Sequence, residues 1–209
     1  MAKEKHLTPE KEKIIANYEM QKQRLFEEGY EEHQETISVL KANGMAFVTA
    51  GPIAALQFMI WILARKGGEG SFGIREMVVF WISFLALIFV HELLHGLGWV
   101  KWTKKKWQSI YLGMMWESLT PYCHCKEPLK PRHYLVGLLT PFLALGIGMF
   151  LAALFVGNQV IFLLGVLNTL SAGGDTTIGC MLFRYLKYRD NCYILDHPTD
   201  CGFVAFVKS

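Results

Sequence analysis

The chain has 209 residues, of which 52% are hydrophobic, and its formal net charge is +3. A water-soluble domain of this size needs a more polar surface than this composition provides, and the charge is too small for a nucleic-acid binder. The apolar residues also gather in long blocks. These features predict a multi-pass membrane protein and exclude nucleic acid as an expected partner.

Residues 1–44 are mostly polar and lack the apolar segment of a cleavable signal peptide. From Thr8 to about Glu28 the pattern is that of an amphipathic helix, which Thr8 can cap and Gly29 can end. Its apolar side carries Ile14, Ile15, Tyr18, Leu25 and Phe26. We expect residues 1–44 to form a cytoplasmic segment whose helix packs on the rest of the protein or lies on the membrane surface, rather than docking a specific partner.

Four apolar blocks are long enough to cross the hydrocarbon core of a bilayer, which needs about 20 residues. They cover residues 45–64, 77–100, 134–156 and 159–183. Only Gly157 and Asn158 separate the last two blocks, which should therefore form an antiparallel hairpin, and the Gly173-Gly174 pair should loosen the fourth helix. We expect residues 45–209 to form one membrane-embedded domain that is all-α apart from a short strand or hairpin between the second and third spans.

The basic residues predict how the spans are oriented. Seven lysine and arginine residues lie between the second and third blocks, whereas the turn between the third and fourth has none. Because positive charge is retained on the cytoplasmic side, we expect a cell-membrane protein with the central loop and both termini in the cytoplasm.

The central loop contains two notable stretches. From Ser109 to Trp116, apolar residues alternate loosely with others, which is typical of a strand. Cys123-His124-Cys125 has metal-binding residue types, but a zinc site usually needs a second such pair and none is evident. We therefore favour a tight turn there. The five cysteines of the chain are an odd number with irregular spacing, unlike a disulfide framework.

The most informative run is His91-Glu92-Leu93-Leu94-His95, inside the second block. On a helix, His91 and His95 lie on one face and can hold one metal ion, and Glu92 beside them can act as a general base towards water. Zinc suits this pair because it accepts neutral imidazole. A charged side chain at the centre of a span costs about 2.5–3.5 kcal/mol. A metal that offsets this cost is favoured over a chance match.

A third protein ligand is needed to complete such a site. Asp175 is the favoured candidate because it is the only acidic residue in the fourth block. His124, with Cys123 and Cys125 on either side, is the rival.

Together these features resemble the site-2 proteases. The shared features are HELLH in a span, a strand-like loop after it, Thr140-Pro141 at the start of the next span, and an aspartate in the last span. HELLHG, TPYCHCKEPL and GGD are more closely similar to the bacterial "putative zincin peptidase" domain of unknown function. The resemblance covers about Lys41 to Gly202, which is most of the chain.

The resemblance implies a zinc-dependent metalloprotease that cleaves peptide bonds of membrane-associated substrates. It assigns the metal to His91, His95 and Asp175, and the role of base to Glu92. In site-2 proteases, a hairpin after the first motif presents substrate as an added strand.

Some further positions of the chain agree with the site-2 protease pattern, and others depart from it. The Ser109–Trp116 stretch has the place of the substrate hairpin. Asn168 is similar to an asparagine upstream of the family's last aspartate and would position substrate. The chain departs from the pattern at Ser171, where a proline is expected, and at Thr176, which replaces a glycine.

Two other functions agree less well with the sequence than a metalloprotease does. A proteolytically inactive zinc-binding membrane scaffold of the same fold is the main alternative, and Glu92 disfavours it because a structural site needs no base. A transporter is disfavoured because only one cluster of ionisable residues lies at membrane depth and no pair of broken spans suggests an inverted repeat. The expected partners are the lipid bilayer and a membrane-protein or peptide substrate, with homo-oligomerisation left open.

Overall fold

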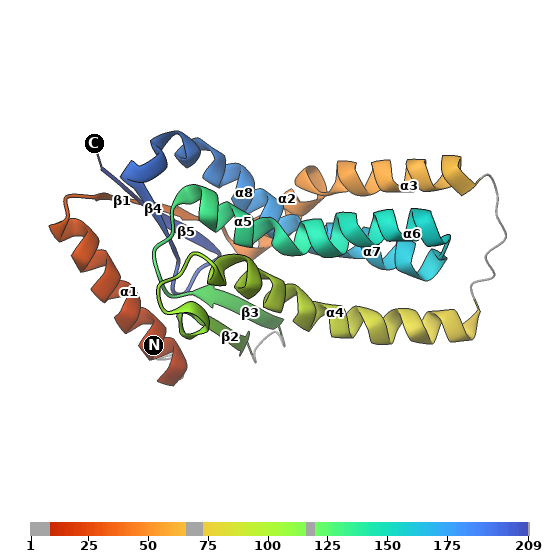
Figure 1. The fold of residues 1–209 in the computed structure, drawn as a ribbon, viewed down its shortest axis with the longest axis horizontal. Coiled ribbons are helices and arrows are strands. Elements are labelled where there is room, and N and C mark those ends of the chain that lie inside the picture. Colours follow the sequence, from red (N-terminus) through yellow and green to blue (C-terminus); the bar gives the residue numbers. More distant parts are fainter. Residues whose placement is uncertain (1–8, 66–72, 116–119, 209) are drawn as a thin grey trace, which may run out of the picture.

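The computed structural model describes residues 9–65, 73–115 and 120–208. A bundle of long helices extends towards one end of the molecule, and a smaller part with strands and helices forms the other end (Figure 1). The described part of the chain is mainly helical and contains five strands. Three of its helices are long and apolar enough to cross a membrane, or four if one bent pair counts as a single span.

The four expected spans correspond to these helices, with broader bounds. The first combines α2 (Val39–Thr49) and α3 (Gly51–Arg65), and the second is α4 (Ile74–Val100). The third runs through α5 (Pro131–Pro141), the π-helical η2 (Phe142–Gly148) and α6 (Met149–Val156). The fourth is the bent pair, α7 (Gln159–Ser171) and α8 (Gly173–Leu182), followed by the 3₁₀ segment η3 (Phe183–Asn191).

The fourth span is broken where the glycine pair predicted a loosened helix. Its two parts are bent by 44°, and the break falls at Ala172, directly before Gly173. The hairpin between the third and fourth spans is also confirmed, since α6 ends at Gly157 with a positive φ of 79° and Asn158 caps α7. The bend changes the direction of α8, which carries Asp175.

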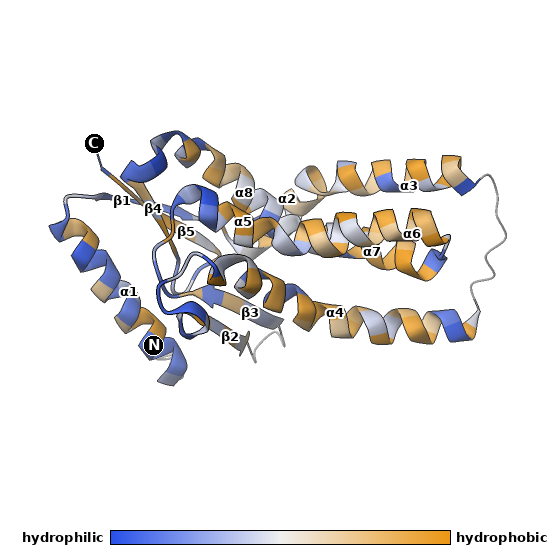
Figure 2. Cartoon of the chain, viewed as in Figure 1, coloured by the Kyte–Doolittle hydropathy of each residue, from blue (hydrophilic) through white to orange (hydrophobic). Residues whose placement is uncertain are grey.

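Apolar and polar residues separate along the long axis of the molecule. Hydrophobic residues cover α3, α4, α6 and α7, whereas α1 and the loops at the other end are largely hydrophilic (Figure 2). The described ends of the chain lie at this hydrophilic end, and the turn between α6 and α7 lies at the opposite end (Figure 1). The structure therefore puts both described ends on the same side of the apolar helices.

A three-stranded antiparallel sheet at the hydrophilic end was not expected from the sequence. It contains β1 (Glu31–Thr36), β5 (Gly202–Val207) and β4 (Cys192–Asp196), in that order. The central strand β5 is covered on both faces, because Phe203, Ala205 and Val207 pack towards α5 and α8 while Val204 and Phe206 pack towards α1. A strand covered on both faces shows no alternation of apolar and polar residues, which is why the pattern of β5 gave no strand signal.

The N-terminal helix α1 (Pro9–Glu27) packs on this sheet. Packing on the rest of the protein was one of the two arrangements expected for this helix. Its buried Tyr18 and Leu25 contact Val204 and Phe206 of β5. The expected cap Thr8 lies outside the described residues. Because β1 pairs with β5 along its whole length, the segment that follows α1 is joined to the C-terminal end of the chain.

A β-hairpin lies between the second and third spans, as expected. It consists of β2 (Ile110–Met115) and β3 (Thr120–Cys125), preceded by the 3₁₀ turn η1 (Lys106–Ser109). The end of the expected strand, Trp116, lies outside the described residues. The expected tight turn at Cys123–Cys125 is wrong, because these residues pair with β2 in β3. Pro121 and the mixed polarity of this stretch conceal the strand, whose formation depends on the partner.

Candidate metal centre

Helix α4 places the two histidines of the HELLH run one turn apart on the same face. The ring centroids of His91 and His95 lie 4.9 Å from each other. His95 is buried, with 5% of its surface exposed, and His91 is half-buried. Many apolar side chains in the N-terminal part of α4 are exposed, whereas the buried residues of this helix all lie near its C-terminal end. The pair therefore lies where α4 enters the packed part of the protein.

Asp175 of α8 brings its carboxylate to both histidines. Its Oδ2 lies 3.1 Å from Nε2 of His91, and its Oδ1 lies 3.5 Å from Nε2 of His95. Ligand atoms from the three side chains all lie within 4.8 Å of one another. Among the described residues, this is the one group of three histidine, cysteine or acidic side chains that is close enough to hold a metal ion.

The spacing of these atoms suits a tetrahedral zinc ion. Zinc binds imidazole nitrogen and carboxylate oxygen at roughly 2.0–2.2 Å, so neighbouring ligand atoms around a tetrahedral ion are separated by about 3.4 Å. The distances from the carboxylate of Asp175 to Nε2 of His91 and of His95, 3.1 and 3.5 Å, lie on either side of that value. Two imidazoles and one carboxylate are also a donor set that zinc accepts, with a fourth position left for water or substrate.

The third span fixes the orientation of His95. The Nδ1 atom of His95 lies 3.0 Å from the carbonyl oxygen of Gly137 in α5. On its other side, the imidazole stacks on Trp99, whose indole nitrogen donates to the carbonyl oxygen of Tyr134 at 2.8 Å. A Cβ atom at Gly137 would lie 2.0 Å from the Trp99 ring. This close contact requires glycine, and it keeps the imidazole in place.

The first span holds α8 in a similar way. The hydroxyl of Thr49 in α2 lies 2.8 Å from that of Thr176 and 3.2 Å from that of Thr177, and it is 3.3 Å from the carbonyl oxygen of Gly173. A Cβ atom at Gly173 would lie 2.2 Å from Cβ of Ala46, so the two helices are in close contact. These contacts lie on both sides of Asp175 in the sequence and fix the helix that carries it.

Glu92 lies next to the cluster of His91, His95 and Asp175 without being part of it. Its side chain is half-buried, and its carboxylate interacts electrostatically with His91, His95 and Asp175. The hairpin packs on α4 through β2 and β3, and the backbone of Cys123 in β3 forms a hydrogen bond with Glu92. A carboxylate in this place can exchange a proton with a water molecule near the cluster.

The rival ligands around His124 have a different arrangement. Nδ1 of His124 lies 3.7 Å from Oδ2 of Asp196, and the same oxygen accepts a hydrogen bond from the amide of Cys125 at 2.6 Å. The Tyr134 hydroxyl donates to the other oxygen of Asp196. Burial, with the nearby charge of Asp196, raises the pKa of the Cys125 thiol, which favours the neutral form. These residues join β3, β4 and α5 around a buried carboxylate.

Asn168, the expected substrate-positioning residue, is buried in α7. Its side-chain amide donates to the carbonyl oxygen of Leu164 in the same helix at 2.8 Å. Within the part of the chain that the structure describes, no hydrogen bond joins it to His91, His95 or Asp175. Asn168 is thus placed in the span that leads to Asp175, and the structure does not bring it into the cluster.

The residues that support the cluster were not predicted from the sequence. Gly137 acts through its carbonyl group and its missing side chain, and a lone glycine in an apolar block gives no signal for either role. Thr49 was not singled out, because a threonine in a span most often bonds its own helix. It does so here, to the carbonyl oxygen of Met45, in addition to its contacts with α8.

Comparison with known protein families gives a match to this chain. A family model described as "Putative zincin peptidase" matches residues 84–192, which extend from the middle of α4 to the start of β4. The matched region contains both histidines, Glu92 and Asp175. No curated protein and no solved structure matches the chain. The zincin description implies zinc and peptide-bond hydrolysis, at the level of the family.

Proposed function

Since the chain belongs to the putative zincin peptidase family, we propose that it is a zinc-dependent intramembrane metalloprotease of the site-2 type. The observation that carries this proposal is the convergence of His91 and His95 with Asp175, from two separate apolar helices, to within 4.8 Å. A site assembled between spans would act on peptide bonds of membrane-associated substrates.

In this proposal His91, His95 and Asp175 hold the metal. Bound there, zinc would supply Lewis acidity, which polarises a carbonyl oxygen and lowers the pKa of water. Nδ1 of His95 donates to Gly137, so that its Nε2 faces the cluster. One carboxylate oxygen of Asp175 faces His91, and the other faces His95.

Glu92 is the proposed general base. It accepts a proton from the attacking water while the water oxygen bonds to the carbonyl carbon of the substrate. When the C–N bond breaks, the same carboxyl group returns the proton to the departing amine. This carboxylate directly follows His91 in the sequence and is half-buried near the other ligands, which suits a base that serves water at the cluster.

Two further parts of the site belong to the proposal. The hairpin of β2 and β3 is a two-stranded sheet among the described residues, so its outer edges can pair with an extended substrate segment. Asn168 would position substrate from α7. Both assignments rest on the resemblance to site-2 proteases together with the position of these elements beside α4.

We also propose that the protein lies in the cell membrane with both termini in the cytoplasm. His91 follows the first residue of α4, Ile74, by 17 positions, which corresponds to about 26 Å along the helix. The lysine-rich segment that starts at Lys101 comes directly after α4. The cluster would therefore lie near the cytoplasmic side of the hydrocarbon core, within reach of water.

The experiment that tests the protease compares three zinc-loaded forms in isolated membranes. New peptide N-termini would be identified by mass spectrometry for the wild type, Glu92→Gln and Glu76→Gln. The Glu76 variant is a matched control in the same helix, because its amide oxygen can still accept the hydrogen bond from Gly73. We expect cleavage by the wild type and the control, and none by Glu92→Gln with zinc still bound.

Undiminished cleavage by Glu92→Gln would contradict the proposal. Zinc binding by all three forms without cleavage by any would favour the alternative, an inactive zinc-binding scaffold of the same fold.

A further inference from the structure

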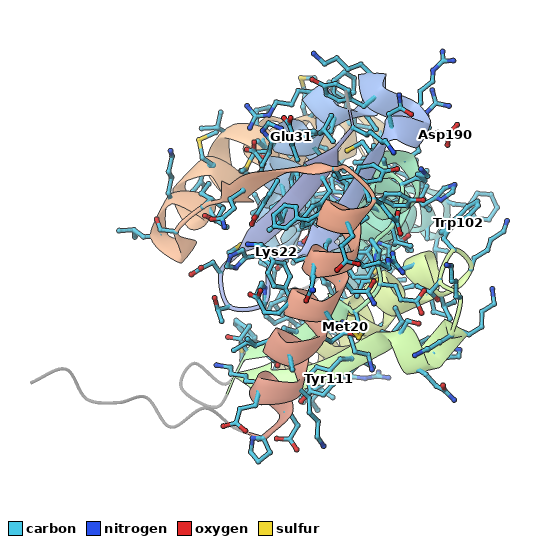
Figure 3. The ribbon with its side chains drawn as sticks, turned by 90° about the vertical axis from the view of Figure 1, so that its left-hand side faces the viewer. Met20, Lys22, Glu31, Trp102, Tyr111 and Asp190 are labelled. Atoms are coloured by element: carbon cyan, nitrogen blue, oxygen red, sulfur yellow. The ribbon has the colours of Figure 1, made fainter. Side chains whose placement is uncertain are left out.

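A second site candidate lies at the hydrophilic end, away from the metal cluster. A cleft of about 510 Å³ opens between α1, the segment after α4, and the segment between β3 and α5. The side-chain amide of Asn17 in α1 donates to the carbonyl oxygen of Lys126 at 2.7 Å and holds two of these walls together. In Figure 3, which faces this end of the molecule, α1 crosses the view, and Trp102 and Asp190 both lie to one side of it.

The lining of the cleft is strongly basic. Five cationic side chains and one carboxylate, that of Glu127, contribute to it. The cationic residues are Arg24, Lys104, Lys105, Lys126 and Lys130. They come from three separate segments, namely α1, the loop after α4 and the segment between β3 and α5, and the fold brings these segments together.

The single carboxylate is engaged within the protein. Glu127 accepts hydrogen bonds from the hydroxyl of Ser109 at 2.5 Å and from the amides of Lys104 and Lys105 at 2.7 and 3.1 Å. Burial acts to raise the pKa of Glu127, but these hydrogen bonds outweigh it and the pKa is lowered. The carboxylate therefore stays ionised and orders the loop, with both oxygens already occupied.

Three of the lysine ammonium groups form no close ion pair within the described part of the chain. Among the described residues, Lys104, Lys105 and Lys126 form no ion pair, whereas Arg24 pairs with Glu28. The Lys130 ammonium donates to the carbonyl oxygen of Asp190 and lies 3.8 Å from the centroid of the Tyr193 ring. The cleft thus has a surplus of positive charge that the protein does not neutralise.

The cleft lies at the level where the apolar helices end. Lys104 and Lys105 follow the end of α4, and Lys130 directly precedes α5. Trp102 lines the cleft and stacks on His133 of α5, with centroids 3.8 Å apart. Tryptophan is enriched at membrane–water interfaces, and basic clusters next to spans attract anionic lipid headgroups.

We propose that this cleft binds a phosphate-bearing group, with Lys104, Lys105 and Lys126 as its principal ligands. Ammonium groups suit a phosphate oxygen as point charges, and the volume of the cleft accommodates more than one phosphate-sized group. The group can be the headgroup of an anionic phospholipid or a free phosphate compound, and the two are distinguished by experiment.

The test uses the full chain in a neutral detergent and two probes. Inorganic phosphate is titrated calorimetrically, and the binding of phosphatidylglycerol and phosphatidylcholine is compared by native mass spectrometry. The cleft variant replaces Lys104, Lys105 and Lys126 with glutamine. The matched control replaces three exposed lysines outside the cleft, Lys13, Lys41 and Lys187, so both variants lose the same formal charge.

We expect the wild type and the control variant to prefer phosphatidylglycerol to phosphatidylcholine, and the cleft variant to bind phosphatidylglycerol at least tenfold more weakly. A triple lysine-to-arginine variant at the three cleft positions should retain binding, because the charge is kept. Binding of inorganic phosphate with the same dependence on the cleft lysines would identify a free phosphate compound as the ligand. Equal weakening in the cleft and control variants, or no binding of either probe by the wild type, would overturn the proposal.

Discussion

The imidazole of His95 and the carbonyl group of Gly137 lie 3.0 Å apart, measured from Nδ1 to the oxygen. A carbonyl oxygen can only accept a hydrogen bond, so the proton of His95 belongs on Nδ1 and the lone pair on Nε2. It is Nε2 that faces Asp175. The third span therefore determines which nitrogen of a second-span histidine is available to a metal.

This relationship predicts that Gly137→Ala will weaken zinc binding without touching a ligand. The added methyl group would lie 2.0 Å from the ring of Trp99, which stacks on His95. We expect a loss of about 1–3 kcal/mol in the free energy of unfolding, because overpacking forces side chains from their preferred positions. Thermal melting in detergent and competition with a zinc-chelating dye would measure both effects.

Gly179→Ala is the matched control for this substitution. Its methyl group would meet Leu135 and Leu139 at 3.6 Å, which is ordinary van der Waals contact. It should melt and bind zinc much as the wild type does. If Gly137→Ala bound zinc as tightly as the wild type, the close packing of Gly137 on Trp99 would not be what keeps His95 in place.

The contact between α2 and α8 gives a second prediction. Thr49→Val keeps the shape of the side chain and removes the hydroxyl that meets Thr176, Thr177 and the carbonyl of Gly173. We expect a loss of roughly 1 kcal/mol in stability, since hydrogen bonds between membrane helices contribute about 0.6 kcal/mol on average. Zinc affinity should fall as well, because α8 carries Asp175. Thr49→Ser retains the hydroxyl and should preserve both properties, and an equal loss of zinc affinity in the two variants would refute this explanation.

The sequence predicted the long apolar helices and the residues of the cluster more fully than the rest of the fold. Long apolar blocks and the spacing of His91 and His95 are local signals, readable from neighbouring residues. The break at Ala172 was also signalled, by the adjacent glycine pair. Nothing local, however, indicates that α8 would turn its carboxylate towards α4. The choice of Asp175 depended on its being the sole acidic residue of that block.

The three-stranded sheet shows what local signals leave out. β1 is a polar edge strand, and its six residues acquire their structure by pairing with β5, which lies more than 160 positions later in the sequence. β5 is apolar throughout and could equally be read as part of a helix. The basic cleft has the same origin, because Arg24, Lys104 and Lys126 come together only after α1 has packed on that sheet.

The proposed orientation predicts a labelling pattern in intact cells. After removal of the native cysteines, a reporter cysteine in place of Asn158 should react with a membrane-impermeant reagent, and one in place of Lys105 should not. Asn158 and Lys105 lie at opposite ends of the spans, beside the α6–α7 turn and after α4. Replacing Asn158 removes the cap of α7, a loss of about 1 kcal/mol that the fold should tolerate. The reverse labelling pattern would invert the proposed topology.

The zinc content of the purified protein tests the central claim most directly. It would be measured per chain for the wild type, Asp175→Ala and His124→Ala at a fixed concentration of free zinc. We expect one zinc ion in the wild type and at least a tenfold weaker affinity in Asp175→Ala. Zinc should be retained by His124→Ala, because the native His124 side chain faces Asp196 and not the cluster. A wild type that binds no zinc, or zinc that is lost with His124 and kept without Asp175, would contradict this claim.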